Sequence, residues 1–179
     1  EVKFIQEITV EVITGPGERA SNSQNMLRTS TWINSRIEKI TDNPEMTSKY
    51  NYPQNRNYSE YDILFISNQL TLPEFDDYIY FKQSTGYIVK SITTEDIYAT
   101  YTGQDDQEKI RNCVIDYYTN YGIMAVILGG DADPNSSTDR IVPHRGFWGT
   151  VDNDYDVPAD MYYACLDGTW NDDGDAKWG

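Results

Sequence analysis

The sequence is poor in cationic side chains, histidine and cysteine. Its 179 residues carry 14 Lys and Arg against 29 Asp and Glu, a formal net charge of −15. Nucleic acid or an anionic membrane is therefore not expected as a partner, because their phosphates would be repelled. Two cysteines without a CxxC pair exclude a disulfide framework and give no zinc motif.

Long apolar runs and phosphate motifs are missing as well. No stretch approaches the ~20 apolar residues of a membrane-spanning helix, so no transmembrane segment is expected. Neither GxGxxG nor GKS/GKT occurs. What is present is 39% apolar and 13% aromatic residues, including 15 Tyr, which is enough to build a folded core. Because the chain begins at Glu1 without Met or a leader, it is expected to be trimmed at its start.

The regular part of the sequence starts after residue 60. Short apolar segments predict three strands, at 63–66, 87–92 and 123–128. Helical patterns lie between them and end at Gly86 and Gly122. Strands and helices that alternate at this spacing predict an α/β fold, a parallel sheet with flanking helices.

The carboxyl ends of parallel strands usually carry ligands, which places three loops at the functional edge of the predicted sheet. These are residues 67–70, residues 93–98 and the acidic segment after Leu128. Before residue 61, an alternating segment at 2–13 predicts a β-rich start, 21–41 a helix and 42–60 a connecting loop. The predicted division is therefore an N-terminal strand and linker region, 1–60, and an α/β subdomain, 61–179.

The acidic segment holds the sharpest local motif. From Asp131 onward there are eleven Asp and three basic residues, so eight of the fifteen excess negative charges lie there. Asn171, Asp173 and Asp175 alternate around Gly174, and Asp167 precedes them. Because Ca²⁺ takes about 6–8 oxygen ligands, Asn171, Asp173 and Asp175 are candidate calcium ligands. The alternative is an acidic surface turn whose side chains bind their own backbone.

Other acidic pairs give weaker signals. Asp131 and Asp133 follow the third apolar segment, as in the Mg²⁺-dependent haloacid dehalogenase phosphatases, but the surrounding motif matches poorly and no cationic clamp for phosphate is evident. Asp152, Asp154 and Asp156 also alternate, which favours an extended, solvated edge.

Cysteine–histidine catalysis within this chain is not favoured. Cys113 lies on the apolar face of its predicted helix, which indicates a core residue. Cys165 lies in a segment, 161–166, that is predicted as a strand, and its acidic surroundings disfavour a thiolate. His144 is interpreted as a surface or packing residue.

Taken together, the blocks of sequence resemble the gingipain-type cysteine peptidases, family C25. The resemblance runs in order through residues 61–68, 81–87, 105–112, 128–131, 158–163 and 166–175. It implies the first subdomain of a caspase-like α/β catalytic domain, similar to a flavodoxin-like fold. It also implies a secreted or surface protein of bacteria that hydrolyses peptide bonds with a Cys nucleophile and a His base.

The resemblance also says which residues transfer. The family's catalytic His and Cys lie in the second subdomain, beyond Gly179, so no catalytic residue is assigned here and the fragment alone is expected to be inactive. Bound calcium is usual in the family, which supports the loop of Asn171, Asp173 and Asp175, with Asp167. Asp160 and Tyr162 are interpreted as bordering the substrate cleft. The implied partners are a peptide or protein substrate and the missing second subdomain.

Two other functions stay open at this point. One is a calcium-stabilised binding or structural module that keeps the peptidase fold without catalysis. The other is the Mg²⁺ phosphatase, which would depend on Asp131.

Overall fold

The computed structural model describes residues 9–11, 13, 15, 38–45, 60–132, 140–149, 154–175 and 177–179. The chain divides into two units, Glu1–Pro53 and Gln54–Gly179, each of which is described by itself. In the first unit, residues 38–40 are helical and residues 44–45 form part of a 3₁₀ turn. Residues 9–11, 13 and 15 form no strand, so the predicted β-rich start is not shown. The other residues of the predicted strand segment 2–13, and residues 21–37 of the predicted helix 21–41, lie outside the described residues.

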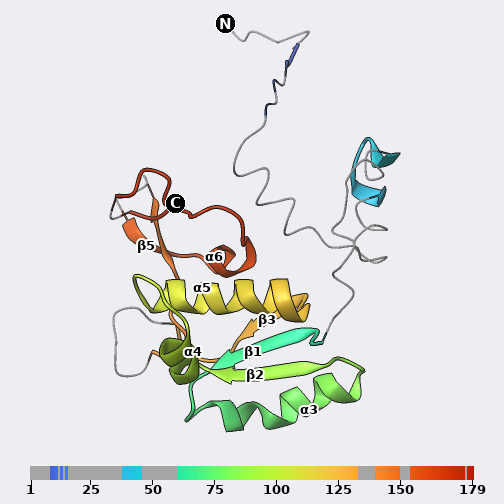
Figure 1. Ribbon diagram of the computed structural model, residues 1–179, viewed down its shortest axis with the longest axis vertical. Helices are drawn as coiled ribbons and strands as arrows, with labels where there is room; N and C mark the ends of the chain where they lie inside the picture. The colour runs from blue at the N-terminus through green and yellow to red at the C-terminus, as the bar shows by residue number, and fades with distance from the viewer. Residues whose placement is uncertain are drawn as a thin grey trace, which may run out of the picture. The chain divides into compact units, whose positions relative to one another are not determined.

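The second unit is built on a three-stranded parallel sheet, as predicted (Figure 1). Strands β1 (Ile63–Ser67), β2 (Val89–Thr93) and β3 (Ala125–Leu128) lie in the order β2-β1-β3. Ile63 is in register with Val89 on one side and with Ala125 on the other. All five residues of β1 are buried, which fits a continuous apolar central strand with both faces covered.

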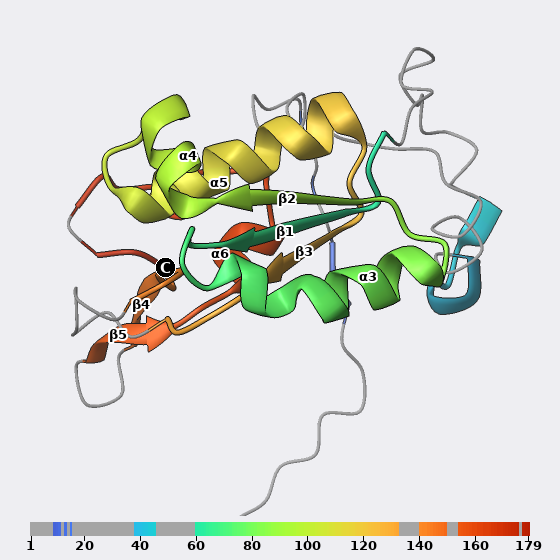
Figure 2. The same ribbon diagram turned by 90° about the horizontal axis from the view of Figure 1, so that it is seen from below.

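Helices lie on both faces of the sheet. Figure 2 shows α3 (Asp76–Ser84) on one face and α4 (Thr94–Thr100) with α5 (Asp106–Asp116) on the other. The core between the sheet and α5 contains Leu64, Ile66, Ile97, Ile110, Cys113 and Val114. Cys113 is fully buried, so its predicted place in the core is confirmed.

The helix boundaries differ from those predicted, for local reasons. A 3₁₀ turn, Leu72–Phe75, precedes α3. The predicted loop 93–98 is wrong: Thr93 accepts a hydrogen bond from the backbone N–H of Asp96, and this N-cap starts α4. Helix α5 ends in a π-helical turn, Tyr117–Tyr121, and at Gly122, whose φ of 90° is the left-handed conformation that favours glycine.

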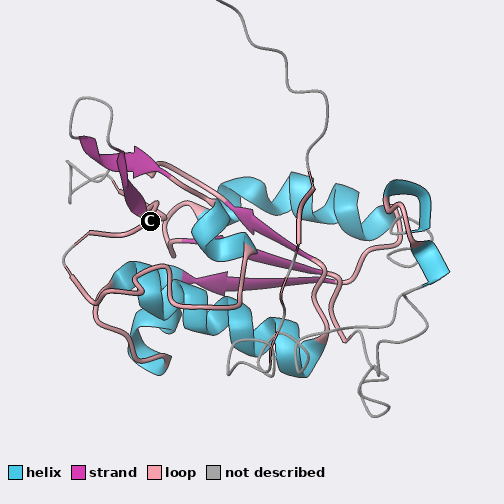
Figure 3. Ribbon diagram, turned by 90° about the horizontal axis from the view of Figure 1, so that it is seen from above, coloured by secondary structure: helices cyan, strands magenta, loops and turns pink. Residues whose placement is uncertain are grey.

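A hairpin and a short helix follow the parallel sheet. Strands β4 (Gly146–Gly149) and β5 (Asp154–Pro158) pair antiparallel, and helix α6 covers Met161–Ala164. In Figure 3 the two strands of the hairpin lie apart from the three parallel strands. The predicted strand at 161–166 is wrong, because backbone carbonyls of this segment bind a side chain of α5 rather than a neighbouring strand. In the part of the chain that the structure describes, no helix is long and apolar enough to cross a membrane.

Candidate functional site

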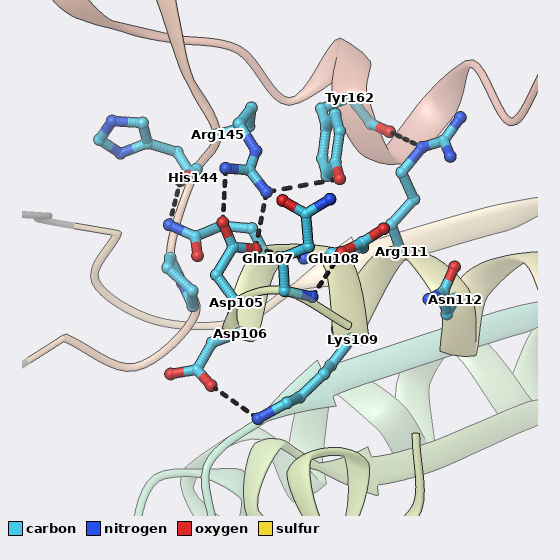
Figure 4. Close-up of polar contacts among 12 residues, drawn as sticks. Asp105, Asp106, Gln107, Glu108, Lys109, Arg111, Asn112, His144, Arg145 and Tyr162 are labelled. Carbon is cyan, nitrogen blue, oxygen red and sulfur yellow. Dashed lines mark hydrogen bonds and ion pairs between the residues drawn. The ribbon is translucent and has the colours of Figure 1, made fainter. Parts of the chain in front are cut away.

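A cluster of buried arginines joins the start of α5 to the C-terminal residues (Figure 4). We call Asp105, Arg111, Arg145, Tyr162 and Trp178 the arginine clasp. Asp105 is the N-cap of α5, and its carboxylate accepts a hydrogen bond from the backbone N–H of Glu108 at 2.9 Å. The same carboxylate accepts two hydrogen bonds from the guanidinium of Arg145, at 2.8 and 2.7 Å. This bidentate pair fixes the orientation of Arg145.

Two aromatic rings cover the guanidinium of Arg145. Its central carbon lies 3.8 Å from the ring centre of Trp178 and 4.6 Å from that of Tyr162. Only 5% of Arg145 is exposed, and burial of a cation is tolerated here because a carboxylate and two π faces surround it. Burial by itself would raise the pKa of Asp105, but the hydrogen bonds from Arg145 and from the backbone of Glu108 hold that pKa below its ordinary value.

Arg111 enters the clasp from the next turn of α5 and is 6% exposed. Its guanidinium donates to the carbonyl of Tyr162 at 2.9 Å, Cys165 at 2.9 Å and Gly168 at 3.2 Å. These carbonyls belong to α6, to the residue that ends it, and to the start of residues 167–177, which we call the acidic loop. Arg111 therefore holds the start of that loop in place with hydrogen bonds from a buried cation.

His144 is buried between two oxygen atoms. Its Nδ1 lies 3.0 Å from the carbonyl oxygen of Ala132, and its Nε2 lies 3.1 Å from Oδ1 of Asp156. The residue is 5% exposed, so the predicted role in packing is closer to the structure than a surface role. Asp156, which was expected only on a solvated edge, thus contacts a buried ring, while Asp152 lies outside the described residues.

Neither cysteine is paired with this histidine. Cys113 is fully buried, and burial raises its thiol pKa to about 12. Cys165 is exposed and follows α6. Since both ring nitrogens of His144 contact other groups, the described residues contain no Cys–His pair arranged for nucleophilic catalysis.

The acidic loop is closed by hydrogen bonds to its own backbone. Asp173 accepts from the N–H of Asp175 at 3.2 Å, and Asp175 accepts from the N–H of Lys177 at 2.6 Å. Asn171 donates from its side chain to the carbonyl of Asp175 at 2.8 Å. Gly174 has a φ of 70°, which permits the tight turn.

This arrangement bears on calcium binding in two ways. Oδ1 of Asn171 is buried without a hydrogen-bond partner, an oxygen that a cation would satisfy. The described residues nevertheless contain no group of three or more His, Cys, Asp or Glu side chains that could hold a metal ion. The donors thus have the right chemistry for calcium, but Asp167, Asp173 and Asp175 are not gathered into a coordination sphere in this conformation.

The remaining sequence candidates lie in different places. The side chain of Asp131 is exposed and its carbonyl accepts hydrogen bonds from residues 141 and 142, while Asp133 lies outside the described residues. Tyr162, interpreted as bordering a cleft, is 1% exposed and belongs to the clasp; Asp160 precedes α6 and is exposed.

The arginine clasp was not predicted from the sequence. Two signals could have indicated it. Arg111 stands next to Ile110 on the apolar side of a predicted helix, and Arg145 follows the segment Val142-Pro143-His144 in a chain with few cations. Arg145 pairs with Asp105, 40 residues earlier, and Arg111 donates to the carbonyl of Cys165, 54 residues later, so the pairing itself depends on the fold.

The comparison with models of protein families agrees with the resemblance of the sequence blocks. The model of peptidase family C25 matches residues 56–176, which is more than half of the chain and includes the sheet, every clasp residue except Trp178, and most of the acidic loop. The searches of curated proteins and of solved structures found no match.

Proposed function

Because the chain belongs to peptidase family C25, the gingipain family, we propose that it is the first, non-nucleophilic subdomain of a secreted cysteine endopeptidase. In this proposal the nucleophile and base that hydrolyse the peptide bond come from outside these 179 residues. The family match over residues 56–176 carries the proposal. The engaged ring of His144 and the buried thiol of Cys113 support the assignment of catalysis to other residues.

On this proposal the chain supplies a scaffold. The parallel sheet fixes the loops at its carboxyl edge, and the arginine clasp fixes the hairpin and the acidic loop relative to α5. Catalytic side chains keep their geometry only when the surrounding structure is rigid, and the sheet and the clasp would supply that rigidity to catalytic residues from another part of the protein.

The test uses the 179-residue chain and a longer polypeptide that continues along its gene. We expect the longer protein to cleave fluorogenic peptides, to be inactivated by iodoacetamide, and to retain activity when Cys113→Ala and Cys165→Ala are introduced. The 179-residue chain should be inactive. If the short chain cleaves peptides and loses that activity with Cys165→Ala, the proposal is wrong; if the longer protein is inactive, the non-catalytic binding module becomes the better interpretation.

We also propose that the acidic loop binds Ca²⁺ through Asp167, Asn171, Asp173 and Asp175. The buried, unpartnered Oδ1 of Asn171 and the alternating oxygens support this, and binding would require the carboxylates to exchange backbone N–H groups for the ion. Titration calorimetry with CaCl₂ should show binding that is lost in Asp173→Asn and retained in Asp77→Asn, an exposed aspartate on α3. No heat of binding, together with a melting temperature insensitive to a chelator, would overturn it.

Location outside the cytoplasm is a proposal that rests on the family. Fractionation of cells that express the natural protein tests it, with recovery in the cytosol as the contrary result.

A further inference from the structure

The surroundings of His144 specify a charge state for its ring. The carbonyl of Ala132 can only accept a hydrogen bond, and an ionised Asp156 carboxylate can only accept as well. A neutral imidazole has one N–H and one lone pair, so either neutral tautomer places its lone pair against an oxygen, at 3.0 or 3.1 Å. Only the imidazolium cation donates to both oxygens.

The two oxygens belong to different parts of the fold. Ala132 lies in the segment that leaves the carboxyl end of β3, and this segment is held against residues 141 and 142 by hydrogen bonds to the carbonyl of Asp131. Asp156 lies in β5 of the hairpin. The ring of His144 therefore links the functional edge of the parallel sheet to the hairpin.

The approach of Asp156 is built into the hairpin by a glycine. A Cβ at Gly146 would overlap Oδ1 of Asp156 and would lie 2.9 Å from its Cα, so no larger residue fits without moving β5. The backbone carbonyl of His144 also accepts a hydrogen bond from the side chain of Gln107 on α5, at 3.2 Å. These contacts fix the histidine on three sides.

The other charged groups near His144 either form an ion pair with another residue or are exposed to solvent. Arg145, the next residue, points to the other side, where Asp105 of α5 pairs with it (Figure 4). Asp131, beside Ala132, is exposed to solvent. Among the described residues, Asp156 is the carboxylate that faces the ring, and its own side chain is 44% exposed.

We propose that His144 is held as the imidazolium cation between Ala132 and Asp156, and that this contact is a pH-sensitive link between the sheet edge and the hairpin. Its contribution to stability is present at acidic pH, where the ring is cationic whether the chain is folded or not. The contribution is lost as the pH rises and the folded ring gives up its proton. The hairpin should then loosen from the sheet edge in alkaline solution. This inference is independent of the proposed peptidase function.

The single histidine of the sequence makes the charge state directly measurable. In the 179-residue chain labelled with ¹⁵N-histidine, we expect both ring nitrogens to show the chemical shifts of protonated nitrogen at pH 6.5. A neutral ring in the folded protein at that pH, with one protonated and one bare nitrogen, would overturn the proposal. The measurement needs no substitution, so it does not depend on whether a variant folds.

A second measurement tests the link itself. In Asp156→Asn, the side-chain amide can turn its NH₂ toward the Nε2 of a neutral His144 ring. The ring then no longer has to be cationic, and the side chain at position 156 keeps its volume. Between pH 6 and pH 8 the Tm of the unmodified chain should fall by ~3–12 °C more than that of Asp156→Asn, the shift that one charge-assisted hydrogen bond gives in a domain of this size. Asp77→Asn should follow the unmodified chain. Equal pH dependence in Asp156→Asn and in the unmodified chain would contradict the link.

Discussion

The two halves of the C25 domain are held together by different forces. Residues 60–132 form the parallel sheet and its helices, in which all of β1 is buried and its Leu64 and Ile66 share a core with α5. Residues 140–179 contain a hairpin, a one-turn helix and an acidic loop, and two buried arginines tie them to α5. The first half relies on burial of apolar area, which has no preferred direction, and the second on hydrogen bonds and charge pairs that require exact partners.

The two halves share one boundary in the core. Val142, Tyr162 and Tyr163 from the second half pack in the same buried cluster as Leu64 and Ile110 from the first. The arginine clasp surrounds this boundary. Loss of the sheet core should therefore unfold both halves, whereas loss of the clasp should loosen the second half alone.

The largest expected effect is in the sheet core. Leu64 is fully buried in β1, so Leu64→Ala should lower the free energy of unfolding by about 2–5 kcal/mol, through lost burial and the cavity left behind. Leu70→Ala is the matched control, because Leu70 is 84% exposed and the change there should stay within about 0.5 kcal/mol. Urea unfolding measures both. Equal effects at the two positions would show that β1 is not the centre of the core.

The contrast between the halves also explains what the sequence could predict. The strands and helices of residues 60–132 follow from runs and periods of apolar residues, and the parallel sheet was predicted correctly on that basis. The error at 93–98 came from reading Thr93 and Asp96 as loop residues, when together they form an N-cap.

The second half was harder to predict because its contacts are long-range and polar. The segment 161–166 has the apolar content of a strand, but Arg111, more than 50 residues earlier, takes its carbonyls. The composition of the acidic loop predicted oxygen ligands, whereas the distance between their oxygens depends on backbone turns at Gly168, Trp170 and Gly174, all with positive φ. For Trp170 no sequence rule would suggest that conformation.

A smaller effect is expected in the clasp. Arg145→Lys keeps a positive charge but loses the second hydrogen bond to Asp105 and the flat contact with Trp178, so it should cost about 1.5–3 kcal/mol. Arg140→Lys is the control, because Arg140 pairs at 3.2 Å with the partly exposed Asp106, and pairs of that kind contribute about 0–1 kcal/mol.

Hydrogen exchange locates the effect of Arg145→Lys. Amides of β4 and α6 should exchange faster, while those of β1 keep their protection. Faster exchange in β1 to the same extent would mean that the clasp stabilises the whole domain, and the distinction between the two halves would have to be abandoned.

The smallest expected effect is a pH dependence in the clasp. The pKa of Asp105 is lowered from its ordinary value of 3.8, so the unfolded chain takes up its proton at a higher pH than the folded chain does. The stabilisation is therefore complete above about pH 5 and is lost as the pH falls toward 3 and below.

Asp105→Asn keeps an N-cap for α5 but removes the charge that faces Arg145. The gap in Tm between the unmodified chain and Asp105→Asn should be widest near pH 7 and should narrow toward pH 3. In an Arg145→Lys background the gap should be smaller at neutral pH, because the strongest of the groups that lower the pKa of Asp105 is weakened while the N–H of Glu108 remains. A gap that stays constant from pH 7 to pH 3 would mean that Asp105 stabilises the second half as a helix cap and not through its charge.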